Sequence, residues 1–66
     1  MSDIIKLEHE LEGLKREYAH IEQQIKDLAH EDVLSPFKLL KLKKDRLVIR
    51  DKIIAIEEQI YPDVIA

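Results

Sequence analysis

The 66-residue chain contains no cysteine, only one glycine and only two prolines. Without cysteine it can form neither a disulfide nor a thiolate metal site. A chain this short buries a modest core, so its stability must come from regular helix packing or from oligomerisation. We therefore expect a single domain over residues 1–66 that is held together by side-chain packing.

Long apolar runs are also absent. No segment approaches the ~18 consecutive apolar residues that a membrane span needs. Residues 1–6 lack the basic segment and the apolar block of a signal peptide. The sequence therefore predicts no membrane partner and, by default, a cytoplasmic location.

Charge is plentiful but uneven. Charged residues make up 38% of the chain, and the net charge is −3. Residues 1–32 hold nine acids and four bases, whereas residues 33–66 hold seven bases and five acids. With many charged residues, one glycine and two prolines, the amino-acid composition is typical of a helix-forming sequence. Halves of opposite sign attract when they fold together, and the whole chain is too acidic to predict a nucleic-acid partner.

Two heptad patterns predict two helices. In the first, apolar residues recur at alternating spacings of three and four, which indicates a helix with one narrow apolar seam. This first seam comprises Ile4, Leu7, Leu11, Leu14, Tyr18, Ile21, Ile25 and Leu28. The second seam comprises Leu39, Leu42, Arg46, Ile49, Ile53, Ile56 and Ile60.

Capping signals set the predicted bounds of these helices at about 3–31 and 36–60. Ser2 or Asp3 can cap the first helix. Ser35 is a good N-cap for the second, with Pro36 at its first position, where a missing N–H costs nothing. Pro62 ends the second helix.

The seams match when the helices are paired antiparallel. Every facing pair has residue numbers that sum to 67, as Leu11 and Ile56 do. Two independent periodicities thus agree on one register, and the predicted fold is an all-α, two-helix antiparallel hairpin.

Arg46 is the charged seam residue, and it either extends its head to solvent or fixes the register. Flanking charges predict three proximities: Glu31 near Lys38, Glu17 near Lys52, and Glu22 near Lys43 and Arg50.

Two stretches resemble a known family. Residues 42–53 read LKKDRLVIRDKI and residues 18–25 read YAHIEQQI. They resemble the YdcH-like family, small bacterial helical-hairpin proteins classed as a domain of unknown function. The family often has histidine where this chain has Tyr18, and an acid where it has Lys52. The resemblance implies the hairpin fold and a bacterial cytoplasmic protein, and it implies no catalytic residues.

Catalytic and metal-binding patterns are missing. No two of the three histidines (His9, His20 and His30) are three or four residues apart, as a helical metal pair requires. Both serines are expected helix caps, and no glycine-rich loop could hold phosphate. A two-helix hairpin also lacks a deep pocket. We therefore expect no enzyme activity, no cofactor, no metal and no small-molecule substrate.

A second apolar stripe runs along the second helix. It consists of Leu40, Leu47, Ile54 and Tyr61, each seven residues apart, with Phe37 and Val48 nearby. The expected function is a structural or interaction module that forms a homo-oligomer through this surface, most simply a dimer that makes a four-helix bundle.

Three other interpretations stay open. The stripe could simply be the wide apolar edge of the hairpin. It could instead bind an unknown protein partner, which would make the chain an adaptor. The basic run over residues 38–52 could bind nucleic acid weakly, but no aromatic residue interleaves it for base stacking, and a solvated face complementing the acidic first helix is favoured.

Overall fold

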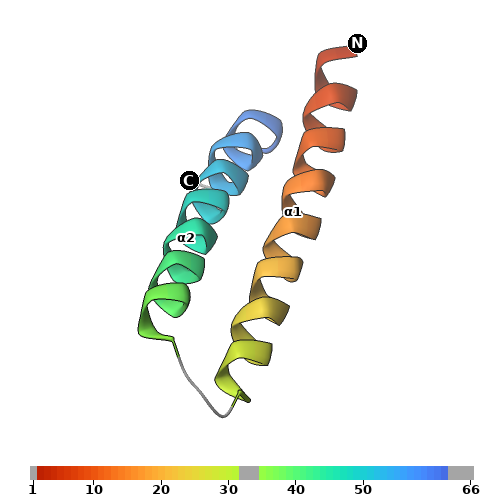
Figure 1. The fold of residues 1–66 in the computed structure, drawn as a ribbon. Coiled ribbons are helices and arrows are strands. Elements are labelled where there is room, and N and C mark those ends of the chain that lie inside the picture. Colours follow the sequence, from red (N-terminus) through yellow and green to blue (C-terminus); the bar gives the residue numbers. More distant parts are fainter. Residues whose placement is uncertain (1, 32–34, 63–66) are drawn as a thin grey trace.

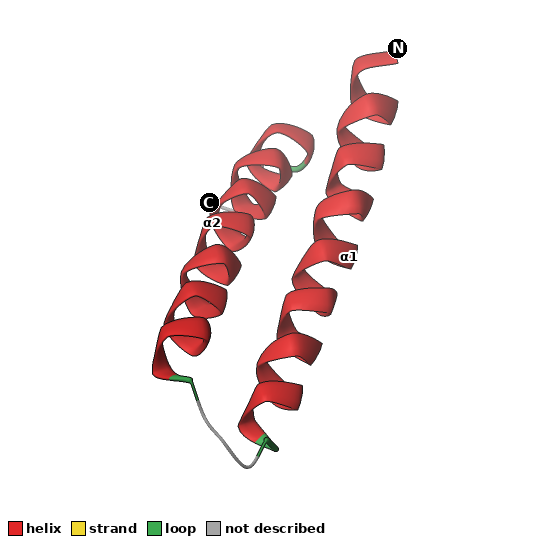
Figure 2. Cartoon of the chain, viewed as in Figure 1, coloured by secondary structure: helices red, strands yellow, loops and turns green. Residues whose placement is uncertain are grey.

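The computed structural model describes residues 2–31 and 35–62, which form two antiparallel helices, α1 (Ser2–Ala29) and α2 (Pro36–Ile60). The helices lie side by side, and the N-terminal end of α1 extends past the end of α2 (Figure 1). The molecule is elongated, with extents of 50 × 21 × 15 Å. The described residues contain no strand (Figure 2). The predicted all-α hairpin is therefore confirmed.

The start of α2 follows the predicted capping chemistry. Ser35 has an extended backbone (φ −98°, ψ 105°), and its side-chain oxygen accepts a hydrogen bond of 3.4 Å from the Lys38 N–H. The Ser35 carbonyl accepts from the Leu39 N–H at 3.1 Å, which begins the helical hydrogen bonding. Pro36 occupies the first turn, where no N–H donor is needed.

The end of α2 also lies where the sequence predicts. Tyr61 leaves the helical conformation at φ −127° and ψ 63°, while its N–H still donates to the Glu57 carbonyl at 2.7 Å. Pro62 follows directly, and the residue before a proline is disfavoured in helical geometry. The predicted bounds 36–60 are therefore confirmed.

The bounds of α1 differ slightly from the prediction. The helix ends at Ala29, and the His30 N–H then donates to the Asp27 carbonyl at 3.1 Å in a tighter turn. Ser2 and Asp3 lie inside the first turn and do not precede it, so the predicted cap position is wrong by one or two residues. At that place the Asp3 carboxylate complements the helix macrodipole. Residues 32–34 of the predicted connection lie outside the described residues.

The core consists of the two predicted seams. The buried apolar side chains come from both helices, and they are Leu11, Ile21, Leu28, Ile49 and Ile56. Most other described seam residues are half-buried. Ile4 is an exception at 55% exposed, because the predicted register would set it opposite position 63, beyond the end of α2.

The contacts between the helices agree with the predicted register. Arg46 Nη1 lies 3.0 Å from Glu22 Oε1, one position away from the predicted pairing of Arg46 with Ile21. Nearer the other end of the hairpin, Leu14 lines the same shallow depression as Lys52, one position away from its predicted partner Ile53. Two separate points along the hairpin therefore place the helices at the alignment that the seams require.

Candidate protein-interaction surface

The predicted interaction residues are exposed in the hairpin. Their exposed fractions run from 37% for Ile54 to 86% for Phe37, and the full set is Phe37, Leu40, Leu47, Val48, Ile54 and Tyr61. Leu40 is 68% exposed and Leu47 is 53% exposed, although leucine side chains are among those most often buried. The hairpin alone therefore leaves this apolar surface in contact with water.

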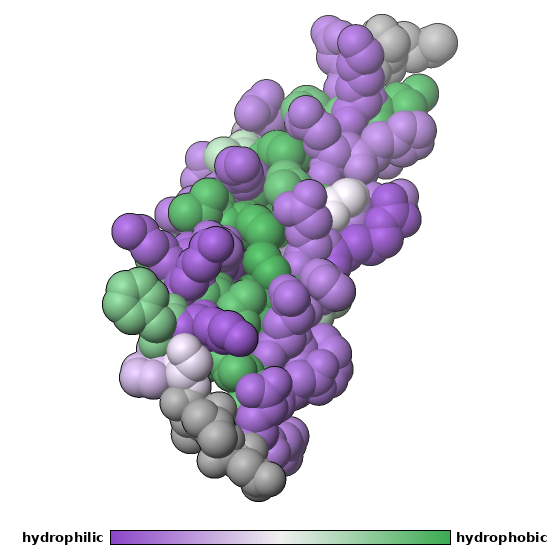
Figure 3. All heavy atoms as spheres, in the orientation of Figure 1, coloured by the Kyte–Doolittle hydropathy of each residue, from purple (hydrophilic) through white to green (hydrophobic). Residues whose placement is uncertain are grey.

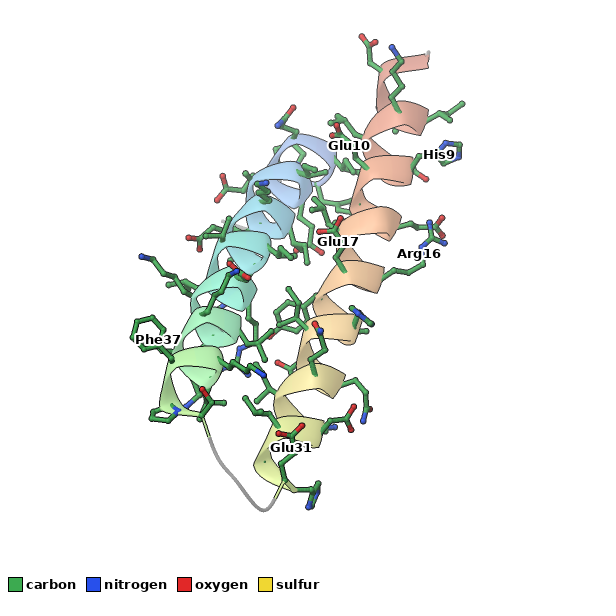
Figure 4. The ribbon with its side chains drawn as sticks, viewed as in Figure 1. His9, Glu10, Arg16, Glu17, Glu31 and Phe37 are labelled. Carbon is green, nitrogen blue, oxygen red and sulfur yellow. The ribbon has the colours of Figure 1, made fainter. Side chains whose placement is uncertain are left out.

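Helical geometry places four of these six residues along one line. At 3.6 residues per turn, positions seven apart stay almost aligned, so Leu40, Leu47, Ile54 and Tyr61 form one line about 31 Å long at ~1.5 Å per residue. We call these four residues the α2 stripe. Phe37 lies further round the helix and points away from α1 (Figure 4).

The α2 stripe runs beside the junction of the two helices. Leu47 lines a shallow depression with Tyr18 of α1 and with Lys43, Arg46 and Arg50. This part of the stripe is therefore bordered by basic side chains.

The other end of the stripe has a different border. Tyr61 lines a depression with residues of α1, among them Glu8 and Glu12. The border of the stripe is thus basic beside Leu47 and mixed beside Tyr61, where His9 and Lys15 lie with the two glutamates.

Arg46 forms the ion pair that links the helices. Its partner is Glu22, and both side chains are 34% exposed. Glu22 was predicted to lie near Lys43 and Arg50; its ion pair is with Arg46, which lines the same depression as those two bases. The geometry satisfies both interpretations of Arg46, since its head lies at the surface and also contacts the opposite helix.

The other two predicted proximities form no ion pair in the described residues, although Glu31 and Lys38 do line the same shallow depression. Within residues 2–31 and 35–62, neither Glu31 with Lys38 nor Glu17 with Lys52 comes within 4.0 Å. Glu17 nevertheless lies on the side of α1 that faces α2 (Figure 4). Exposed pairs gain little Coulomb energy in water and lose side-chain freedom, so their absence costs little.

The basic residues of α2 are distributed around the helix. Apart from Arg46, which is half-buried, the run consists of exposed residues: Lys38, Lys41, Lys43, Lys44, Arg50 and Lys52. On the face in Figure 3, hydrophilic side chains cover most of α1, and apolar side chains follow the line where the helices meet. This face is largely polar on the α1 side; most of its apolar groups lie along the line where the helices meet, and others lie at the left edge and near the upper end of the molecule (Figure 3).

No cluster of three or more His, Cys, Asp or Glu side chains suited to a metal ion occurs in the described part of the chain. His9 is exposed and points away from α2 (Figure 4). Neither α1 nor α2 is long and apolar enough to cross a membrane.

Sequence reasoning missed one exposed apolar pair. Ile4 and Ile5 at the start of α1 are 55% and 51% exposed. The signal was present in the two adjacent isoleucines, of which the heptad seam can bury only one. Both lie in the N-terminal part of α1, the end that extends past α2 (Figure 1).

Comparison with known proteins gives one match. A family described as "Protein of unknown function (DUF465)" matches residues 11–57. This span holds most of both seams and three residues of the α2 stripe, and it is consistent with the predicted resemblance to YdcH-like proteins, a small domain of unknown function. No curated protein and no solved structure matches the chain.

Proposed function

The chain belongs to the DUF465 family of proteins of unknown function, and we propose that it is a non-enzymatic helical interaction module that associates with a second copy of itself. The contact is made by the α2 stripe. The observation that carries this proposal is the exposure of four large apolar side chains along one line of α2. Soluble monomers rarely leave a contiguous apolar patch of several hundred Å² in water.

The surface area of the hairpin supports the same proposal. The chain exposes 5557 Å², whereas a folded monomer of 7.8 kDa is expected to expose about 4,400 Å². The excess, roughly 1,200 Å², exceeds the ~800 Å² that each partner buries in a standard interface. An elongated hairpin thus has enough surface to lose to a partner.

Burial of the stripe supplies part of the free energy of association. Burying one Leu or Ile side chain contributes roughly 1.5–3 kcal/mol. Leu47 and Ile54 are central and can be covered completely by a second helix. Each is already partly buried, so the gain is smaller than the full value, but two copies contribute it twice. A two-fold dimer of hairpins is the simplest closed arrangement, and it produces a four-helix bundle.

Leu47→Glu tests the proposal, because it places a charge at the centre of the stripe. Leu47 is 53% exposed in the hairpin, so the substitution should leave the helices intact. We expect sedimentation equilibrium to give a dimer for the wild type and a monomer for the variant. Ala55→Glu is the matched control: it adds the same charge to an exposed position of α2, outside the stripe, and should remain dimeric.

Circular dichroism separates loss of association from loss of folding, since a monomeric Leu47→Glu variant must keep its helical signal. A wild-type protein that stays folded and monomeric at high concentration would refute self-association. The same α2 surface would then be assigned to a different protein, as in the adaptor interpretation.

A further inference from the structure

The charges of α2 are arranged against its own dipole. Residues 36–50 hold six bases and one acid, whereas residues 51–60 hold three acids and one base. The first turn contains no acid and the last turn contains no base. A helix is stabilised by acids near its N-terminus and bases near its C-terminus, so this pattern is unfavourable for α2 alone. An antiparallel neighbour with the same pattern would complement both ends.

We propose that two copies pair α2 against α2 in antiparallel orientation, about a two-fold axis that passes between Arg50 and Asp51. This inference rests on the proposed self-association and adds to it the orientation and register of the pair. In this arrangement, the α2 stripe of one copy packs against the α2 stripe of the second copy.

The stripe is self-complementary about this axis. Residues whose numbers sum to 101 lie at the same level, so Leu47 faces Ile54 of the second copy, and Leu40 faces Tyr61. Every stripe residue then packs against another stripe residue. Such a contact is isologous, because each surface meets its own equivalent, and it closes at two copies.

The charges beside the stripe match in the same register. At 3.6 residues per turn, Lys43 and Glu57 lie along one edge of the stripe, and Lys44 and Glu58 lie along the other. Antiparallel pairing brings the same edges of two helices together. Lys43 therefore approaches Glu57 of the second copy, and Lys44 approaches Glu58, each within one residue of the shared level. The dimer contains four such pairs of opposite charge.

The centre of the contact is neutral as a whole. Each copy brings one Arg50 and one Asp51. The two arginines face each other along one edge and the two aspartates along the other, so these two central contacts are repulsive and oppose the four attractive pairs. A parallel pairing is much less favourable, since the basic half of α2 would lie against a basic half along its whole length. Like charges that face each other across an interface oppose association, so electrostatics selects the antiparallel orientation.

Charge reversal at one end of α2 tests this orientation. In Lys43→Glu/Lys44→Glu, all four attractive pairs become repulsive, and we expect the dimer dissociation constant to rise about tenfold or more at low salt. In a parallel dimer the same change would replace facing bases by facing acids, and the affinity would stay close to that of the wild type.

The complementary change should restore the dimer. Adding Glu57→Lys/Glu58→Lys to the first variant exchanges the two ends, so that each pair again joins opposite charges. We expect the fourfold variant to regain an affinity near that of the wild type. Lys41→Glu/Lys52→Glu is the matched control, since it makes the same change in net charge at two exposed positions away from the stripe. It should leave the dissociation constant within about threefold of the wild-type value.

Cysteine crosslinking measures the register independently of affinity. In the antiparallel register, Leu47→Cys and Ile54→Cys proteins should form a disulfide when mixed, and neither should when oxidised alone. Position 47 of one copy lies seven residues from position 47 of the other, about 10 Å at ~1.5 Å per residue, which is beyond disulfide reach.

The outcomes separate the two proposals. A wild-type dimer that is insensitive to the double reversal, or that crosslinks through Leu47→Cys alone, would overturn the antiparallel arrangement and leave self-association standing. A wild-type protein that is monomeric at every concentration would overturn both. Weakening by the double reversal, recovery by the fourfold variant and crosslinking only in the mixture would support the arrangement.

Discussion

Replacing Arg46 by leucine measures what a charged residue contributes to the apolar seam. Arg46 Nη1 lies 3.0 Å from Glu22 Oε1, and both side chains are 34% exposed. An ion pair with this much access to water contributes ~0.2–1 kcal/mol to the free energy of unfolding. Its register neighbour Ile21 is buried, so an apolar side chain at position 46 would have a seam residue to pack against.

The expected change follows from the exposure of the site. Full burial of a leucine contributes roughly 1.5–3 kcal/mol, of which about two-thirds is available at a position that stays one-third exposed. The methylenes of Arg46 already supply part of this gain, which leaves ~1 kcal/mol. Leucine and arginine have similar helix propensities. After about 0.5 kcal/mol is subtracted for the lost ion pair, Arg46→Leu should stabilise the hairpin by roughly 0.5 kcal/mol.

Thermal unfolding followed by circular dichroism is the appropriate assay. A gain of this size should raise Tm by about 2–4 °C in a domain of this length. Several protein concentrations are needed, because association makes Tm depend on concentration. Arg16→Leu is the control, since Arg16 is exposed on α1 and points away from α2 (Figure 4). A fall of more than about 5 °C for Arg46→Leu would refute the reasoning and assign Arg46 a register-fixing role.

Three further predictions concern the hairpin itself. Gly13→Ala should raise the free energy of unfolding, measured by urea denaturation, by about 1 kcal/mol. The added Cβ meets nothing within 4 Å, and glycine is unfavourable in a helix interior. A loss of stability would show that this side of α1 is already covered. Ser35→Ala should lower the free energy of unfolding by about 0.5–1 kcal/mol through the lost cap, whose 3.4 Å hydrogen bond is long, and an unchanged midpoint would mean that the cap is not formed in solution. Cysteines at Leu14 and Ile53 should crosslink within one chain, whereas cysteines at Leu14 and Leu42 should not, as non-reducing electrophoresis of a dilute sample would show; the reverse pattern would exclude the register.

Local signals explain why α2 could be predicted to the residue. Ser35 and Pro36 determine where it begins, and Pro62 determines where it ends, each through backbone chemistry within a few positions. The C-terminal end of α1 has no such signal, since neither glycine nor proline follows Ala29 directly. Its position depends on the tight turn through His30, which periodicity alone does not encode. The prediction therefore placed the end two residues late.

Side-chain partners were harder to predict than the fold. The register brought Glu22 near three bases of α2, but it could not decide which long, flexible side chain would reach the carboxylate. The exposure of Ile4 likewise depends on where the other helix ends. The exposure of the α2 stripe was predictable for a simpler reason, because a two-helix protein has no third layer to cover a second apolar face.

The two apolar lines of α2, the seam and the α2 stripe, have different surroundings in the hairpin. The seam faces α1, where buried isoleucines such as Ile49 and Ile56 hold the hairpin together. The α2 stripe lies beside the junction with α1, its side chains stay 37–68% exposed, and its flanking charges change sign along the helix. This change from basic to acidic side chains is unfavourable for α2 alone, since it opposes the helix macrodipole. One contact from α1, the ion pair of Glu22 with Arg46, offsets part of the excess positive charge. The same sign change is favourable when a second α2 runs in the opposite direction. In the proposed dimer, the feature that weakens an isolated α2 is therefore the feature that orients its partner.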